Sequence, residues 1–430
     1  MAGEDAVYED FEEKLSWRAH GAIPPQMLRE SAGDPEQWSA NLKAYPFTDP
    51  VLISTFAESA PPTIAWLKSK GVQFTYGSPM LLQKGGQRLA PSCGGLAIVE
   101  ALAASAEQLG VEVRYETTGR SLLLDDRGDV CGLRAWSKEK GVHSIDAGAV
   151  VLASGGFQGN TEMLTRYVGA NAYLSRPVSP GGIYNKGEGI EMALAAGAAA
   201  AGQYEMFHAE PIDPRSTRHE ALVGALNYGI LVNNGGQRFF DEGSDVYEYI
   251  YDEVSWTIMR QKGGIAYFLF DTKLYDVPNV RVRLRSEVAP MRASSAREMA
   301  QQLGVRPDVL EATLRSYNAA VQDGEFDPKV RDGKCAVGIT PPKSNWARTI
   351  DESDLHAYPV MCANTFTCGG VKIDKDGQVL NRDGHPIPGL YAAGEMVGFY
   401  YGLYVGATSV LRGLVFGRRA GQHVAGALGR

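Results

Sequence analysis

Apolar residues recur at every third or fourth position in three stretches of the chain, and this period predicts amphipathic helices. The three stretches are 49–72, 94–110 and 307–324. Gly71 and Gly110 lie at the ends of the first two stretches, where glycine commonly terminates a helix. Ser295 and Glu298 have the spacing of a capping box and predict one more helix, over 294–304. The apolar positions of the three stretches include Leu52, Phe56, Ile64, Leu67, Leu96, Val99, Leu102, Leu109, Leu310, Leu314, Tyr317 and Val321.

Other stretches alternate between apolar and polar residues or are continuously apolar, as strands are. The predicted strands are 111–117, a strand–turn–strand over 121–136, 149–156, 228–234, 265–271 and a hairpin over 369–381. The stretch 149–156 is apolar throughout and enters glycines, which is typical of a buried central strand. The alternation over 281–285 places Arg281, Arg283 and Arg285 on one strand face, where they attract a polycarboxylate or form a solvated edge.

The order of these elements predicts a sheet domain, an inserted second domain, and a return to the first sheet. A length of 430 residues favours two domains over one core. The formal charge of -8 and the pI of about 5.5 argue against a nucleic-acid partner, which a basic face would favour. The chain therefore reads as an α/β protein with an α+β insert that acts on a small molecule.

Cysteine usage and the absence of long apolar runs restrict the protein further. The five cysteines are scattered and form no CxxC pair, so we expect neither a metal site nor a disulfide framework. The acidic start has no features of a secretory signal. No apolar run is long enough for a membrane span. We therefore expect a cytoplasmic protein without a membrane span.

Small residues follow the predicted strand at 149–156. Ala153, Ser154, Gly155 and Gly156 leave little side chain there, so a cofactor or a second stretch of backbone can approach closely. The alternative is a tight strand-to-helix turn that binds no ligand. Chemistry alone does not decide between these two interpretations.

A second small-residue turn, "GLYAAGEMVG" (389–398), lies near the end of the chain. Gly394 permits close approach, and Glu395 can accept hydrogen bonds from a sugar or polyol hydroxyl; the alternative is a surface glutamate. Thr408 and Ser409 are candidate caps for a helix that continues through Val410. The N–H groups at the start of such a helix favour an electron-rich oxygen, whereas the alternative is an ordinary capped core helix.

Five motifs in order resemble those of the FAD-dependent oxidoreductases of the fumarate reductase/succinate dehydrogenase flavoprotein type. This group includes 3-ketosteroid and tricarballylate dehydrogenases. The resemblance extends from about residue 50 to the end of the chain and is nearest to the tricarballylate dehydrogenases. The motifs are "VVLASGGFQGN" (150–160), "NKGEGIEMALAAGA" (185–198), "ILVNNGGQRFFDE" (230–242), "SYNAAVQDGEFDP" (316–328) and "IPGLYAAGEMVG…GLVFGRRAG" (387–421).

This resemblance implies a Rossmann-like FAD-binding domain over 1–165 and 345–430, with an inserted capping domain over 166–344 that completes the substrate site. Members of the group begin with a strand, a GxGxxG turn and a helix that hold the FAD pyrophosphate. The first sixty residues contain only Gly3, Gly21 and Gly33, so the FAD domain is expected to be N-terminally incomplete. Three explanations stay open: a start codon placed too late, a first unit supplied by another chain, or loss of the flavin.

The resemblance also assigns a substrate-binding histidine to His208, for which the alternative is a structural histidine beside Glu205 and Glu210. The arginines that fumarate reductases use have no counterparts in 220–230, 243–251 or 400–408, and Phe366 stands in place of a second histidine. A dicarboxylate needs paired guanidinium groups, so the resemblance does not extend to fumarate reduction.

Tyrosines occupy several of those positions. The stretch "YYGLYVGAT" resembles ketosteroid dehydrogenases, in which a tyrosine before a glycine-rich turn binds the substrate carbonyl. The hypothesis is that Tyr404 polarises a carbonyl or carboxyl group while Tyr247, or another tyrosine of 247–251, acts as acid or base. The alternative is an apolar pocket lined by tyrosines. The tyrosines concerned are Tyr247, Tyr249, Tyr251, Tyr400, Tyr401 and Tyr404.

The resulting expectation is an FAD-dependent dehydrogenase or reductase that acts on a C–C bond next to a carbonyl or carboxylate. Hydride would pass to or from flavin N5 while a side chain handles the proton. The expected partners are a small carbonyl or carboxylate substrate and an unidentified electron donor or acceptor. The main alternative is a flavin-less or truncated auxiliary subunit, and a steroid-type ketone dehydrogenase is a third possibility.

Overall fold

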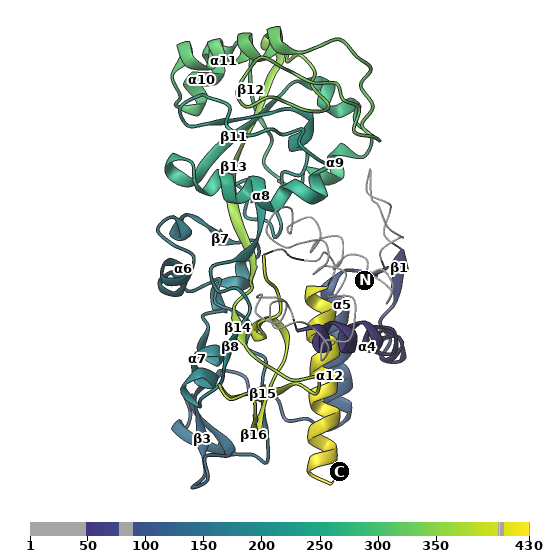
Figure 1. Ribbon diagram of the computed structural model, residues 1–430, viewed down its shortest axis with the longest axis vertical. Coiled ribbons are helices and arrows are strands. Elements are labelled where there is room, and N and C mark those ends of the chain that lie inside the picture. Colours follow the sequence, from purple (N-terminus) through teal and green to yellow (C-terminus); the bar gives the residue numbers. More distant parts are fainter. Residues whose placement is uncertain (1–48, 77–88, 403, 405–407, 430) are drawn as a thin grey trace.

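The computed structural model describes residues 49–76, 89–402, 404 and 408–429. Figure 1 shows an elongated molecule with an upper lobe, which contains β10–β13 and α8–α11, and a lower lobe, which contains β3–β6, β14–β16, α4, α5, α7 and α12. The prediction of an N-terminally incomplete dinucleotide-binding unit falls on 1–48, outside the described residues.

The upper lobe is built on a six-stranded sheet in the order β10-β11-β13-β12, with β7 and β9 paired to β13. All pairs are antiparallel except that between β7 and β13. The strands are β7 (Arg176–Pro177), β9 (Phe207–Ile212), β10 (Ile230–Asn233), β11 (Ile265–Phe270), β12 (Met291–Ala293) and β13 (Leu355–Thr367). The helices are α8 (Tyr247–Met259), α9 (Val280–Arg283), α10 (Ala296–Leu303) and α11 (Pro307–Ala320). The strands expected at 228–234 and 265–271 and the helical pair at 294–324 are confirmed.

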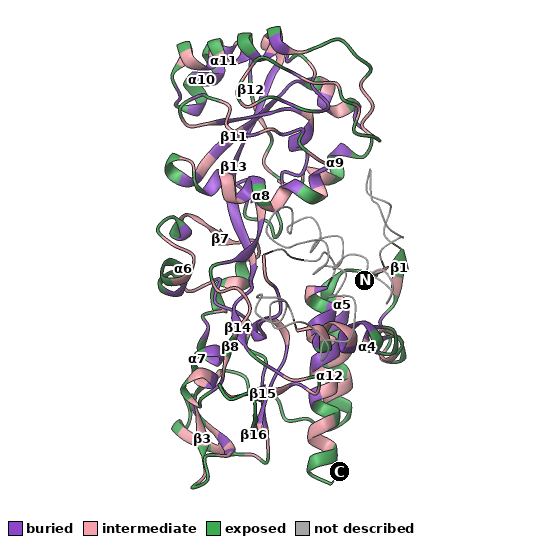
Figure 2. Ribbon diagram, viewed as in Figure 1, coloured by how far each residue is buried: buried purple, intermediate pink, exposed green. Residues whose placement is uncertain are grey.

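Strand β13 connects the two lobes. Its first half pairs with β11 and β12, and its second half, from Met361 to Thr367, pairs with β9. Figure 2 shows β13 buried along most of its length, which explains why its sequence is mainly apolar. The domain boundary at 345 stays a prediction, and β13 lies beyond it while belonging to the sheet of the upper lobe.

Two three-stranded sheets lie in the lower lobe, together with the two-stranded pairs β1-β2 and β14-β8. One has the order β15-β16-β6, in which β6 and β16 are parallel, and the other is the antiparallel sheet β3-β4-β5. The strands of these sheets are β3 (Thr117–Leu124), β4 (Val130–Ser137), β5 (Gly141–Asp146), β6 (Val150–Leu152), β15 (Gln378–Leu380) and β16 (Pro386–Ala392). The remaining strands are β1 (Phe74–Tyr76), β2 (Leu89–Pro91), β8 (Ala200–Ala201) and β14 (Gly370–Val371).

The register of β6 and β16 pairs Val150 with Leu390 and Leu152 with Ala392. The strands run in the same direction, so the turns that follow them lie at the same edge of the sheet. The backbone N–H of Ala393 also donates to Leu152 O at 3.0 Å. The two small-residue turns noted in the sequence, more than 200 residues apart, are therefore neighbours.

Helices α12 and α4 pack against one another in the lower lobe (Figure 1). Phe56 of α4 is fully buried and meets Phe399 in an edge-on contact, with 6.0 Å between ring centroids. The helices are α4 (Pro50–Ser69), α5 (Gly95–Gln108), α6 (Thr161–Tyr167), α7 (Glu188–Ala195) and α12 (Ser409–Ala427). Short 3-10 turns are Ala172–Leu174, Pro180–Tyr184, Leu226–Tyr228, Lys262–Gly264, Thr272–Asp276, Glu352–Asp354 and Gly394–Met396 (η8). The helices expected at 49–72 and 94–110 are confirmed.

Two details of the sequence analysis are wrong. The stretch 281–285 is no strand, because Val280–Arg283 forms the helical turn α9. Arg283 pairs with Glu248 at 2.9 Å, and Arg285 pairs with Glu220 at 2.7 Å, so the arginines do not share one strand face. An alternation over five residues is too short to fix the type of element, and tertiary contacts decide it.

The second error concerns the lower lobe. The expected strand at 111–117 is irregular until Thr117, where β3 begins. Helix α5 forms as expected, but Leu96 and Val99 are each 64% exposed and Leu109 is 76% exposed. The helical period thus predicted the element correctly, although most of its apolar stripe does not face the core of the described structure.

A substitution at Phe56 tests whether the packing of α4 against Phe399 stabilises the lower lobe. We expect Phe56→Ala to lower the free energy of unfolding by about 3–5 kcal/mol, because a buried aromatic ring would be replaced by a cavity. Val51 on the same helix is 47% exposed, and Val51→Ala should change stability by less than about 0.5 kcal/mol. Chemical denaturation of both variants measures this, and equal losses would contradict the packing role of Phe56.

Among the helices of the described ranges, none combines the length and the apolar character that a membrane crossing requires.

Candidate functional site

The first part of the site lies where β6 and β16 end. Gly394 opens η8 with φ of +79°, and Gly155 follows β6 with φ of +80°. Such positive φ values favour glycine, which has no Cβ to clash with the backbone. Among the described residues, no heavy atom lies within 4 Å of the place that a Cβ of Gly394 would take. The turn at Gly394 therefore leaves space that no described side chain fills.

Glu395 lies between the two turns. Its carboxylate accepts hydrogen bonds from the backbone N–H of Thr367 at 2.9 Å, from Gln158 Nε2 at 3.1 Å and from Asn185 Nδ2 at 3.4 Å. Burial raises the pKa of Glu395 above its ordinary value, and the hydrogen bonds from Thr367 and Gln158 act in the opposite direction. Glu395 is therefore a carboxyl group largely enclosed by protein and held by three polar neighbours, and the alternative of a surface glutamate is excluded.

These neighbours also explain two of the glycines after β6. A Cβ on Gly155 would lie 2.8 Å from the amide carbon of Asn185, and a Cβ on Gly156 would overlap Thr367 and Glu395. The close approach at these two positions is thus made by polar side chains of the protein itself. Ala153, Ser154, Gly155 and Gly156 as cofactor contacts stay predictions.

The second part of the site is the start of α12. Thr408 stands at the N-cap, but its side chain makes no capping hydrogen bond. Its hydroxyl lies 2.7 Å from the hydroxyl of Tyr400 instead, and Ser409 Oγ lies 3.2 Å from the hydroxyl of Tyr404. Thr408 therefore links α12 to Tyr400, and its predicted capping role is wrong. Val410 is 60% exposed.

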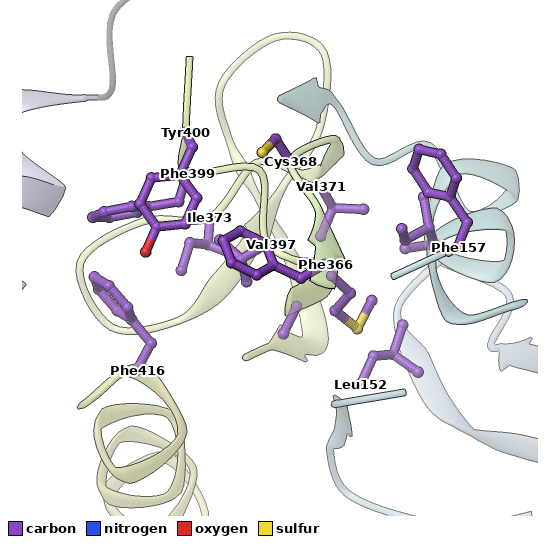
Figure 3. Packing of buried hydrophobic residues seen from close by; sticks show 14 of the residues in the cluster. Leu152, Phe157, Phe366, Cys368, Val371, Ile373, Val397, Phe399, Tyr400 and Phe416 are labelled. Atoms are coloured by element: carbon purple, nitrogen blue, oxygen red, sulfur yellow. The ribbon is translucent and has the colours of Figure 1, made fainter. Parts of the chain in front are cut away.

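Arg412 lies one turn further along α12 and is fully buried. Its Nη1 donates to Val397 O at 3.2 Å, and its guanidinium lies 4.6 Å from the ring centroid of Tyr400. Its Nε has no hydrogen-bond partner within the described part of the chain. Figure 3 shows Phe399 and Tyr400 in the core cluster that also contains Phe416 of α12. The start of α12 thus carries a buried positive charge.

The third part is an aromatic cluster around His208 of β9. The ring centroid of His208 lies 4.4 Å from Tyr404, 5.2 Å from Phe366 and 5.3 Å from Tyr251. Phe366 also contacts Tyr404 edge-on at 5.0 Å. His208 is 4% exposed. The structure therefore brings together two of the predicted catalytic residues, His208 from the middle of the chain and Tyr404 from near its end.

Polar groups lie near both ring nitrogens of His208. Its Nδ1 lies 3.5 Å from Asp252 Oδ1, while its Nε2 lies 3.4 Å from the Tyr251 hydroxyl and 3.9 Å from Glu210 Oε1. Asp252 also accepts a hydrogen bond from the backbone N–H of Ala209 at 2.7 Å, which fixes it beside β9. The acidic side chains next to His208 are therefore Glu210 and Asp252.

Glu210 is a carboxyl group held in its protonated form. Burial and the nearby Asp252 carboxylate raise the pKa of Glu210 to about 8. Its Oε2 accepts a hydrogen bond from the Tyr247 hydroxyl at 3.4 Å. Burial also raises the pKa of Tyr247 and of Tyr251 well above the ordinary value, and the charge of Glu210 adds to this. Both phenols therefore stay protonated at neutral pH.

The pKa of Glu210 predicts a pH dependence of stability. Its ordinary value is 4.5, so the folded state binds one more proton than the unfolded state between about pH 4.5 and pH 8. The free energy of unfolding should therefore fall as pH rises through this range, by an amount on the order of a few kcal/mol. Glu210→Gln should weaken this dependence, and urea denaturation at a series of pH values measures it; an unaltered slope would contradict it.

Tyr251 lies between Tyr247 and the pair formed by His208 and Tyr404. Tyr251, one helical turn after Tyr247 on α8, is the phenol that meets His208, whereas Tyr247 bonds Glu210. The four-residue spacing of the two tyrosines in "YEYIY" is the signal that places both on one helix face. Glu210 was noted only as a neighbour of a structural histidine. Asp252 and Thr367 carried no comparable signal and were missed as site residues.

The three parts of the site meet at β13 and at the start of α12. Phe366 contacts His208, and the next residue, Thr367, donates to Glu395. Tyr404 contacts His208 while its hydroxyl lies beside Ser409 of α12. The predicted cofactor residues and the predicted catalytic residues are therefore adjacent, although they come from different sheets.

Comparison with known proteins gives one family match and several relatives. The FAD binding domain model matches residues 25–411. The NADH:fumarate oxidoreductase of Klebsiella pneumoniae (strain 342) is 30% identical over 391 residues, which cover 88% of this chain and 39% of that protein. The chain thus spans well under half the length of this relative.

Two solved structures resemble the chain in fold. The open conformation of a flavocytochrome c3 fumarate reductase matches with a TM-score of 0.71 and 27% identity over 88% of this chain and 64% of that one. The 3-ketosteroid-Δ4-(5α)-dehydrogenase of Rhodococcus jostii RHA1, in complex with 4-androstene-3,17-dione, matches with a TM-score of 0.64 and 25% identity. The match covers 88% of this chain and 80% of that one.

Proposed function

Because the chain belongs to the FAD binding domain family, as its motifs predicted, we propose that it is an FAD-dependent oxidoreductase that acts on a C–C bond next to a carbonyl group. The observation that carries this proposal is the 4.4 Å contact between His208 and Tyr404 beside the start of α12. A fumarate reductase and a ketosteroid dehydrogenase share its fold, and both names denote chemistry at such bonds.

The residues at the ends of β6 and β16 fit a flavin. Space lies beside Gly394, and two buried acceptors, Gln158 Oε1 and Asn364 Oδ1, have no hydrogen-bond partner in the described chain. Such acceptors suit the hydroxyl groups of the polyol chain of FAD. The backbone N–H groups at the start of α12, with the buried cation of Arg412, suit the electron-rich edge of the flavin ring.

The proposed cofactor contacts are Ala153, Ser154, Gly155, Gly156, Gly394, Glu395, Thr408, Ser409 and Val410. When bound, FAD supplies the two-electron acceptor or donor for the hydride that the substrate carbon exchanges. The protein orients the substrate and handles the proton. Tyr404 donates a hydrogen bond to the substrate carbonyl, which stabilises the negative charge that develops on its oxygen. Ser409, at 3.2 Å, holds the Tyr404 hydroxyl in place.

The charges around His208 favour a ketone over a dicarboxylate as substrate. The Asp252 carboxylate, 3.5 Å from His208 Nδ1, would repel a second substrate carboxylate, and the protonated Glu210 supplies no positive charge to bind one. The other side chains that face His208 from α8, β13 and the start of α12 are the aromatic rings of Tyr251, Phe366 and Tyr404. A flat apolar substrate with one carbonyl group matches these surroundings.

A substrate panel tests the proposal. Protein supplied with FAD and an artificial electron acceptor should oxidise a cyclic ketone to the enone, whereas succinate should give less than about one hundredth of that rate. A preference for succinate would contradict the proposed substrate class. Flavin-loaded protein that is inactive in both directions on every member of the panel would favour the auxiliary-subunit alternative.

A further inference from the structure

One buried carboxyl group has no assigned role in the chemistry described above. Glu210 of β9 lies two residues after His208, and its side chain is 18% exposed. Its two oxygens face different partners: Oε1 lies 3.9 Å from His208 Nε2, and Oε2 accepts from the Tyr247 hydroxyl at 3.4 Å. Glu210 therefore lies beside the His208 ring, which in turn contacts Tyr404.

Every element packed against Glu210 contributes polar or charged groups. On β9 itself the neighbour is His208, and α8 adds two tyrosines and Asp252. The negative charges outnumber the positive ones near the carboxyl, which favours its protonated form. The groups that face it are His208, Tyr247, Tyr251 and Asp252, together with Cys362 of β13, Glu220 and Arg285 at longer range, while Arg283 and Glu248 pair behind Tyr247.

We propose that Glu210 stores the proton that the reaction exchanges, and that His208 and Tyr251 pass this proton between Glu210 and the substrate. The inference rests on the proposed function and names a residue that this function leaves unused. His208 is suited to the relay because its Nε2 lies within 3.4 Å of the Tyr251 hydroxyl and 3.9 Å of Glu210. Asp252 lies 3.5 Å from Nδ1 and adds negative charge beside the ring, which favours a proton on the imidazole during the transfer.

The relay balances in both directions. In dehydrogenation the C–H bond next to the carbonyl breaks, and its proton passes through Tyr251 and His208 to the Glu210 carboxylate. The electron pair left at the α-carbon forms the new C=C bond as the β-carbon loses a hydride, for which bound FAD would be the two-electron acceptor. In reduction the Glu210 acid returns the proton to the α-carbon, and bound reduced FAD would supply the hydride that the β-carbon gains.

This relay predicts opposite pH profiles for the two directions. Dehydrogenation needs Glu210 as the carboxylate, so its rate should rise as pH increases through about 8. Reduction needs Glu210 as the acid, so its rate should fall over the same range. A residue with only a structural role would not reverse the profile with the direction of the reaction.

Glu210→Gln tests the relay, with Glu205→Gln as the matched control. Gln still accepts a hydrogen bond from Tyr247 but carries no proton to exchange. Glu205 is exposed and bonded to Gln203, away from the relay. We expect Glu210→Gln to lower turnover by about 10-fold to 10²-fold and to remove the inflection near pH 8 in both directions. Glu205→Gln should keep both the rate and the inflection.

A second readout does not depend on the flavin. Difference infrared spectra of flavin-free protein should show the C=O stretch of a protonated carboxyl that disappears near pH 8 in the wild type and in Glu205→Gln, but not in Glu210→Gln. Absence of this band in the wild type would overturn the inference whatever the activity. An active Glu210→Gln enzyme with the wild-type pH profile would overturn the relay and leave the proposed function standing. A wild type that is inactive with flavin would overturn the proposed function and the relay together.

Discussion

Replacing Tyr404 with Phe is expected to lower turnover by about 10²-fold or more while the protein keeps its flavin. The substitution removes only the hydroxyl, which the account places against the substrate carbonyl. The ring would keep its contacts with His208 at 4.4 Å and with Phe366 at 5.0 Å, so the cluster should remain folded. Steady-state kinetics in both directions and the visible flavin absorbance of the purified variant measure the two parts of this prediction.

The matched control for this variant is Tyr401→Phe. Tyr401 lies in the same stretch, but its hydroxyl accepts a hydrogen bond from the backbone N–H of Gly202 at 2.8 Å, outside the His208 cluster. This variant should lose less than about 10-fold in turnover, because it affects local packing and not the substrate oxygen. Full activity of Tyr404→Phe with a normal flavin content would remove Tyr404 from the mechanism.

The second large effect is expected at His208. We expect His208→Gln to lower kcat by about 10²-fold to 10⁴-fold, since proton transfer through a positioned imidazole contributes on this scale. The effect should fall mainly on kcat and less on KM, because the ring acts when the proton moves and the neighbouring aromatic rings bind the substrate. Thermal unfolding of the variant reports whether the cluster stays intact.

His423→Gln is the control for His208. His423 lies on α12, and its Nδ1 is 2.9 Å from the hydroxyl of Tyr391, far from β9 along the chain and in a different contact network. Both substitutions remove one imidazole, but His423→Gln should leave kcat unchanged. A loss of similar size in the two variants would show that the His208 effect is not specific to the site.

Much of the fold was predictable because its signals are local. Helical periods identified α4, α5 and α11, and the apolar runs at 228–234 and 265–271 identified β10 and β11. The order of elements predicted a return of the chain to the first sheet, and the parallel register of Leu152 with Ala392 shows where β16 joins β6. The family itself was identified from motif order, and the match over 25–411 confirms it.

The parts that the sequence did not predict depend on distant partners. The pattern at 111–117 has a strand period, but pairing in the described structure begins only at Thr117. The arginines of 281–285 are placed by Glu248 and Glu220, which no local pattern reveals. A strand period describes one chain segment, whereas a strand also needs a neighbour.

The site shows the same limit. His208 and Tyr404 were predicted separately from the resemblance, yet their contact depends on β9, β13 and α12 meeting in space. Glu210 was noted only as a neighbour of a structural histidine, and its proposed role depends on the contacts with His208 and Tyr247 that the fold creates. Thr367 and Gln158 were missed because a residue that fixes Glu395 needs no distinctive spacing.

The central claim is that the turns after β6 and β16, with the start of α12, hold a flavin beside His208 and Tyr404. The most direct test is the amount of FAD that remains bound per chain after the purified protein is mixed with FAD and passed through gel filtration. The account predicts one bound FAD per wild-type chain, and a clear loss in Gly394→Val, which would fill the open space at φ of +79°. A colourless wild-type protein that takes up no FAD would contradict the claim.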